Sequence, residues 1–181
     1  HNTKHHPWSE KASLGLALVN SYQPKSACDP SVSRLYRLII ELEDPTYNTG
    51  RFAYFMQMLG RIFCNQQQLE PARKIWQRAI AFSQSSHYTQ IKAKSFTGLG
   101  NIESLNNNFI QANIYHQQAV ELLEKIAAKC DLAEAYFQWG ITLQANSQET
   151  QSKDCFHKAI AIYQTIPAPK QVARVAKYLT T

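Results

Sequence analysis

The residues that could do chemistry in this chain are histidines, cysteines and carboxylates, and their spacing matches no common catalytic or metal motif. The sequence contains no H-E-x-x-H, no glycine-rich phosphate loop with its lysine, and no G-x-S-x-G. His5 and His6 are more typical of a tag remnant or an incidental pair than of a metal site. Glu121 and Glu124 would share one solvated helix face without a partner acid or base. We therefore expect no enzymatic activity, no metal and no cofactor.

The cysteines indicate a compartment rather than a site. Cys28, Cys64, Cys130 and Cys155 have no C-x-x-C spacing, which argues against a zinc ribbon or a redox motif and favours reduced thiols. No apolar run approaches the ~20 residues that a bilayer span requires, and no N-terminal segment has the apolar stretch of a secretory signal. We predict a cytoplasmic protein without a membrane partner.

Composition fits one globular domain, with 181 residues, 44% hydrophobic and 18% charged. The net charge of +6 is uneven: residues 51–100 hold seven Lys and Arg against one Glu, whereas residues 101–150 hold two lysines against six acids. This asymmetry favours steering of a charged partner or self-association, and the alternative is a solvated helix face. Because the chain begins at His1 rather than at a methionine, we expect a processed protein or a piece of a longer one.

The elements that would position these residues follow a repeat of about 40 residues, a period that indicates stacked supersecondary units. Four sets of positions recur in the same register: Gly60, Gly100 and Gly140; Leu59, Leu99 and Trp139; Trp76, His116 and Phe156; Ala79, Ala119 and Ala159. We expect the glycines and alanines to let neighbouring helices approach closely, and His116 to be a packed, hydrogen-bonded imidazole.

Each period contains two helical patterns. In the second period, apolar spacing predicts one helix from Thr89 to Leu105 and another from about Phe109 to Ala128, separated by three asparagines. Similar polar turns fall at 65–68 and 146–148. Asp131 to Glu134 resembles a capping box that would open the third pair.

These positions resemble the tetratricopeptide repeat. The match covers about residues 47–166, and the third period carries Tyr136, Trp139-Gly140, Phe156 and Ala159 where the family has its large and small residues. Departures are Glu103 and Leu143 at the first-helix aromatic, His116 at the second-helix aromatic, and Ser152 at an alanine. The period is longer than the family's usual one of roughly 34 residues, so the chain looks like the long-period subclass found in bacterial regulatory proteins.

The resemblance implies an all-α fold, a right-handed α-solenoid of antiparallel helix pairs. We predict a single domain over 1–181, with about four pairs and a cap. The segments are 9–46 (a degenerate first pair), 47–86 (repeat 1), 87–128 (repeat 2), 129–166 (repeat 3) and 168–180 (capping helix). In the capping helix, Val172, Val175, Ala176 and Leu179 should face inward and Lys170, Arg174 and Lys177 outward.

The resemblance also implies a groove that takes a peptide or helix. Its positions carried over to this sequence are Tyr54, Gln57 and Arg61; Lys94, Thr97 and Asn101; Glu134, Phe137 and Ile141. Arg61, Lys94 and Asn101 could hold an acidic side chain, because cationic donors make strong hydrogen bonds. The alternative is a solvated inner face whose partner binds elsewhere.

We therefore expect a non-enzymatic scaffold or adaptor that binds a protein or peptide. The alternative is a regulatory domain, gated by a signal peptide, that controls an effector. A homodimer is compatible with the sequence. Nucleic-acid binding is the less favoured hypothesis. Arg73, Lys74 and Arg78 could contact phosphates, but the nearby aromatic residues occupy core positions and could not stack on bases.

Overall fold

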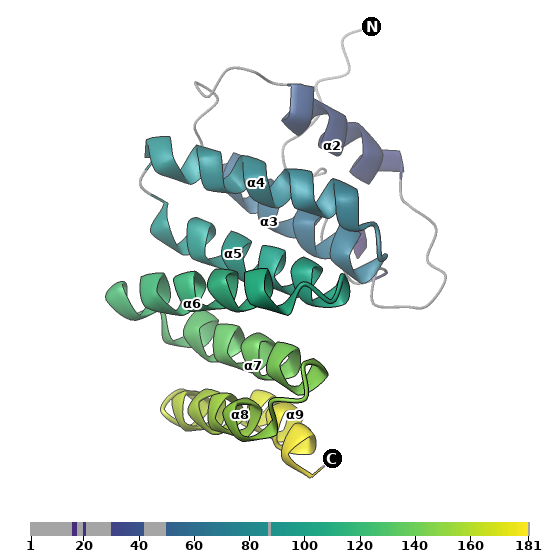
Figure 1. Cartoon of the computed structure of the whole chain (residues 1–181). Coiled ribbons are helices and arrows are strands. Elements are labelled where there is room, and N and C mark those ends of the chain that lie inside the picture. The colour runs from purple at the N-terminus through teal and green to yellow at the C-terminus, as the bar shows by residue number, and fades with distance from the viewer. Residues whose placement is uncertain (1–15, 18–19, 21–29, 42–49, 87, 181) are drawn as a thin grey trace, which may run out of the picture. The chain divides into compact units, whose positions relative to one another are not determined.

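Every element described in the computed structural model is helical, which confirms the all-α class within residues 16–17, 20, 30–41, 50–86 and 88–180. Within each of the two compact units described below, consecutive helices pack against one another. The elements are α2 (Pro30–Glu41), α3 (Gly50–Asn65), α4 (Leu69–Ser86), α5 (Thr89–Leu105), α6 (Phe109–Lys125), α7 (Lys129–Ala145), α8 (Glu149–Gln164), α9 (Pro169–Ala176) and a short 3-10 helix η1 (Lys177–Leu179), labelled in Figure 1.

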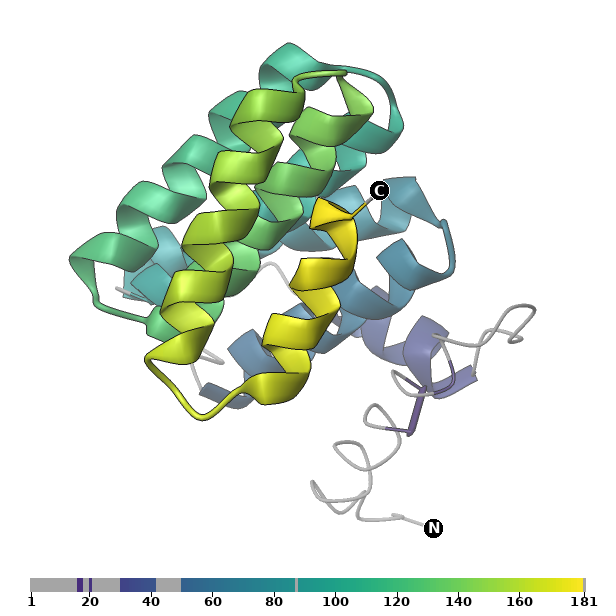
Figure 2. The same ribbon diagram turned by 90° about the horizontal axis from the view of Figure 1, so that it is seen from below.

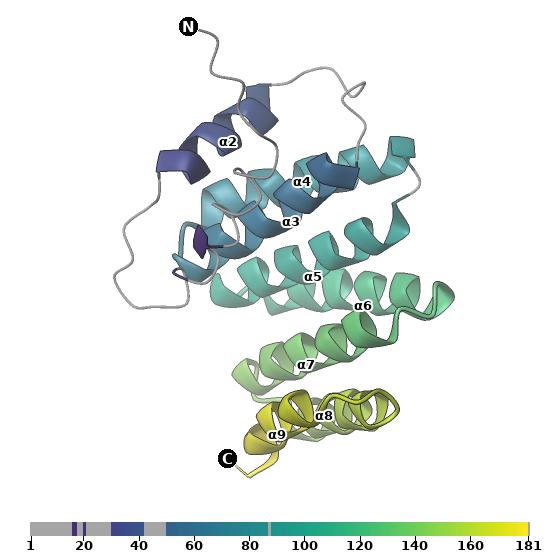
Figure 3. The ribbon, with the colours of Figure 1, turned by 180° about the vertical axis from the view of Figure 1, so that it is seen from behind.

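The helices form two compact units, and the boundary between Ser86 and His87 coincides with the predicted boundary between repeats 1 and 2. In unit 1, α2 packs on α3 and α4, and α3 packs on α4. In unit 2, α5 to α9 pack in chain order and α5 also contacts α7, as Figure 3 shows from behind. Of the predicted first pair, α2 is present, and most of the segment before it lies outside the described residues.

Helix starts follow a constant interval from α4 onward. The six starts are at residues 69, 89, 109, 129, 149 and 169. The helix predicted over Thr89–Leu105 begins and ends at those residues. The next helix ends at Lys125, shortly before the predicted end, because a turn of the same kind follows it.

The turns share one hydrogen-bonded geometry built on a left-handed residue. Gln67, Asn107, Ala127 and Ser147 have φ of 58°, 60°, 52° and 56°. After α5, the Asn108 N–H donates to the Glu103 carbonyl at 2.8 Å and the Asn107 N–H donates to the Ser104 carbonyl at 3.0 Å. This is the Schellman pattern, and it satisfies carbonyls that the helix end would otherwise leave unpaired. The same pair of bonds closes α3, α6 and α7.

The predicted capping box at Asp131 is wrong. Helix α7 begins at Lys129, its N-cap is Ala128, and no side chain caps it. Asp131 therefore lies in the first turn, where a carboxylate still interacts favourably with the helix dipole. The turn after α6 determines where α7 starts, because the last residue of that turn, Ala128, is the N-cap of α7.

The repeated glycines make room for a ring rather than for a neighbouring backbone, which corrects the predicted contact. A Cβ on Gly60 would lie 2.4 Å from the Trp76 ring, and one on Gly140 would lie 2.4 Å from the Phe156 ring. At Gly100 the ring is the imidazole of His116, at 2.8 Å. Each ring comes from the second helix of the same repeat. Ala79, Ala119 and Ala159 are fully buried, as expected of small residues between helices.

Three departures from the repeat pattern each have a hydrogen-bond partner. Glu103, which is buried, accepts from Asn108 Nδ2 at 3.0 Å. The buried Ser152 hydroxyl donates to the Gly140 carbonyl at 2.9 Å. His116 Nε2 lies 2.9 Å from Thr142 Oγ1, and the imidazole is fully buried, which confirms the expectation for this residue. Each of these side chains thus pairs at least one polar atom, which lowers the cost of its burial, although Nδ1 of His116 is buried without a partner.

Candidate functional site

Unit 1 places its three predicted groove residues on one face of α3. Tyr54 and Gln57 are half-buried and Arg61 is exposed. Their spacing of three and four positions puts them side by side along the helix. The part of the predicted groove in unit 1 is therefore one helix face that carries an aromatic ring, an amide and a guanidinium.

In unit 2, one of the predicted residues of α5, Lys94, meets an acid on α7. Lys94 Nζ lies 3.1 Å from an oxygen of Asp131, and Gln90 Nε2 donates to the same carboxylate at 2.5 Å. Thr97 donates to the Ala93 carbonyl at 3.3 Å, and Asn101 is half-buried beyond it. Lys94 does hold a carboxylate, as its chemistry suggested, but that carboxylate belongs to the chain itself.

Glu134 of α7 binds side chains of two neighbouring helices. Its carboxylate accepts from Tyr163 of α8 at 3.0 Å, from Gln138 at 2.8 Å, and from the guanidinium of Arg174 on α9. The contact with Arg174 is a salt bridge as well as a hydrogen bond. A residue predicted to face a ligand thus ties three helices together.

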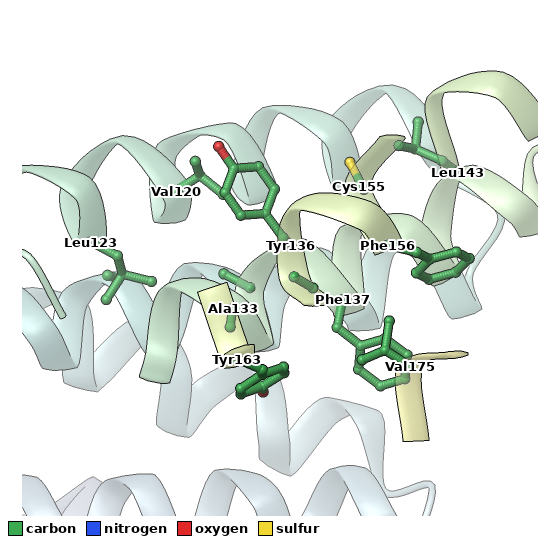
Figure 4. Packing of buried hydrophobic residues seen from close by; sticks show 13 residues of the cluster. Val120, Leu123, Ala133, Tyr136, Phe137, Leu143, Cys155, Phe156, Tyr163 and Val175 are labelled. Carbon is green, nitrogen blue, oxygen red and sulfur yellow. The ribbon is translucent and has the colours of Figure 1, made fainter. Parts of the chain in front are cut away.

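Phe137 is not an exposed groove residue, which corrects the prediction for this position. It is 3% exposed, because the guanidinium of Arg174 lies 4.5 Å from its ring centroid and the Tyr178 ring packs edge-on at 5.1 Å. Figure 4 shows Phe137 beside Phe156 and Val175, and Figure 2 shows α9 lying beside α8. Ile141 packs half-buried against the same core. The C-terminal helix therefore covers this end of the predicted groove.

Arg174 and Asp131 pair with predicted groove residues, and the sequence analysis selected neither of them for this face. Arg174 is exposed, as expected, and it also pairs with Glu134 and covers Phe137. A signal was present, since Lys94, Glu134 and Arg174 recur at one repeat interval and alternate in charge. Extending the repeat register into α9 would have placed these three residues at equivalent positions on successive first helices.

Shifted pKa values in the described residues all move away from neutral pH. Burial lowers the pKa of His116 to about 3 and raises the pKa of the Cys155 thiol to about 11. Burial, with the nearby Glu124, raises the pKa of Tyr136 to about 12. Burial also raises the pKa of Tyr163, and Glu134 adds to that effect. Catalytic acids and bases need the opposite tuning, toward the operating pH.

Metal and membrane features are both missing from the described ranges. Among those residues, no three His, Cys, Asp or Glu side chains gather as metal ligands. No helix within them has both the length and the apolar character to cross a bilayer. No protein-family model matches the chain, and no curated protein sequence matches it. The tetratricopeptide resemblance therefore depends on the residues and their spacing.

Proposed function

We propose that this chain is a non-enzymatic interaction module of tetratricopeptide type that binds a protein segment along the inner face of its first helices. In this proposal antiparallel helix pairs stack into a right-handed α-solenoid. Support comes from the constant spacing of helix starts, from the recurring turn, and from the ring that faces each repeat glycine. Stacked units of this kind present long surfaces suited to extended ligands.

The observation that carries the proposal is a row of polar side chains on alternate helices of unit 2. Lys94 on α5 meets Asp131 on α7, and Glu134 on α7 meets Arg174 on α9. Residues at equivalent register positions thus lie along one face, partly exposed, from the first helix of unit 2 to the last. A protein segment lying across these helices would meet every charge in turn.

The partner that fits this face best has acidic side chains. The Lys94 and Arg174 side chains are 33% and 46% exposed, so both cations can be reached from solvent. Exposed ion pairs contribute little to stability, about 0–1 kcal/mol, because water competes for both charges. A ligand carboxylate could therefore share Lys94 with Asp131 or Arg174 with Glu134, while Glu134 keeps its hydrogen bonds to Tyr163 and Gln138.

A random peptide library displayed on phage and selected against the full chain tests the proposal. We expect enriched sequences to contain Asp or Glu, and selected peptides to bind Lys94→Glu and Arg174→Glu variants at least tenfold more weakly. Lys153→Glu on α8 is the matched control, since it makes the same charge change at an exposed position outside the predicted groove. Equal binding by the groove variants and the control would exclude this face as the site.

A further inference from the structure

Helix α6 carries an exposed apolar patch that its own fold does not use. Ile110 is 81% exposed and Ile114 is 44% exposed, and Leu105 at the end of α5 is 63% exposed. Ile110 and Ile114 are one turn apart and therefore lie on the same side of the helix. We refer to these three residues as the α6 patch.

The other repeats show that these positions do not require apolar side chains. Repeat 1 has Glu70 and Lys74 where repeat 2 has Ile110 and Ile114, and repeat 3 has Thr150 and Asp154. All four of these polar residues are exposed. Helices α4 and α8 thus form with charged or polar residues in the same register. Packing among the described residues therefore does not account for the isoleucines.

The segment of chain that carries the α6 patch contains no charged residue. The segment from Ser104 to Val120 includes no Asp, Glu, Lys or Arg, and it is the longest such stretch in the chain. The exposed residues around the patch are amides: Asn106, Asn107, Asn108, Gln117 and Gln118. Glu121 is the first charge in line with the isoleucines, and it accepts from Gln117 at 3.0 Å.

We propose that the α6 patch is the contact by which two copies of this chain associate. Each copy carries a net charge of +6, so two whole chains repel on average, whereas the uncharged segment from Ser104 to Val120 adds nothing to that repulsion. An amide both donates and accepts hydrogen bonds, so an amide rim can pair with a copy of itself. A rim that selects a charged partner would instead carry complementary charges. Two-fold association needs this self-complementarity, since each residue then meets the same patch on its partner.

The size of the patch predicts a weak dimer. A stable interface buries about 800 Å² on each partner, and three apolar side chains with an amide rim supply only part of that area. We therefore expect a dissociation constant between about 1 μM and 1 mM. Added salt should tighten the dimer, because it screens the repulsion between the two positive chains.

Sedimentation of the full chain across that concentration range tests the proposal. The disrupting variant is Ile110→Glu with Ile114→Lys, which installs the residues of repeat 1 and should leave the helix intact, as circular dichroism can verify. The control is Thr150→Glu with Asp154→Lys, which puts the same two residues at the same register on α8. We expect the wild type and the control to dimerise, and the Ile110/Ile114 variant to remain monomeric.

Three results would overturn the proposal. These are a wild type that stays monomeric at the highest concentration, an Ile110/Ile114 variant that dimerises as the wild type does, and a dimer that dissociates as salt is added. If the wild type stayed monomeric and an immobilised apolar helix retained it, the proposal would also be overturned, because the patch would then bind a different protein.

Discussion

His116 and Thr142 replace apolar residues at two different repeat positions, and the two replacements contact each other. His116 stands where the other repeats have Trp76 and Phe156, and Thr142 stands where they have Ile62 and Ile102. The two side chains come from α6 and α7, are both buried, and lie 2.9 Å apart. One substitution therefore compensates the other across the junction between repeats 2 and 3.

A double-mutant cycle should reveal this compensation. His116→Phe leaves the Thr142 hydroxyl buried without a partner, and Thr142→Ile leaves His116 Nε2 in the same position, so each should cost about 1–3 kcal/mol. The double variant replaces both partners by apolar groups and should be close to wild type. Urea denaturation followed by circular dichroism measures all four proteins. Additive losses in the double variant would contradict the compensation.

The same imidazole should make the fold sensitive to acid. Its pKa is about 3 in the folded chain against 6.5 for an ordinary histidine, so between these values the unfolded chain binds a proton that the folded chain does not. The free energy of unfolding is therefore unaffected by the titration of this histidine above about pH 6.5. It decreases as the pH falls toward about 3, by up to about 1.4 kcal/mol per pH unit. Denaturation at about pH 7 and about pH 5 measures the loss. His116→Phe should lose less than wild type over this interval, and equal losses would assign the acid sensitivity to other groups.

Ala127 holds a backbone conformation that suits glycine. It occupies the left-handed region at φ of 52° in the turn between α6 and α7, which costs a residue with a Cβ about 1–2 kcal/mol. Ala127→Gly should therefore raise the free energy of unfolding by about 0.5–1 kcal/mol, after the added flexibility of the unfolded chain is subtracted. Asn107→Gly, in the equivalent turn, is the control and should gain less, because asparagine tolerates this conformation. A loss of stability in Ala127→Gly would show that the turn depends on the methyl group.

Gly140 should not tolerate even a methyl group. An alanine Cβ would lie 2.4 Å from Phe156 Cε1, so the ring or the helix must move, at a cost of about 1–3 kcal/mol. Thermal unfolding of Gly140→Ala measures the cost. Adding Phe156→Leu should recover part of it, since a smaller side chain then faces the new methyl group. If Gly140→Ala unfolded at the wild-type temperature, the ring contact would not limit this position.

Much of the local structure followed from the sequence alone. The repeat period placed the helices of repeat 2, the polar turns after three helices, and the burial of His116. A helix face repeats with every turn, so the spacing of apolar residues is enough to show which side is buried. The alanines at fixed positions are buried as expected, whereas the glycines at fixed positions face rings instead of a neighbouring backbone.

The contacts between residues far apart in sequence were decided only by the tertiary structure. The sequence did not show that Gly140 faces Phe156, that Phe137 lies beneath Arg174 and Tyr178, or that Asp131 binds Lys94 rather than capping its own helix. Periodicity defines the direction of a side chain from its own helix axis, but not what it meets there. That depends on how closely two helices pack and on how far each side chain reaches across the gap.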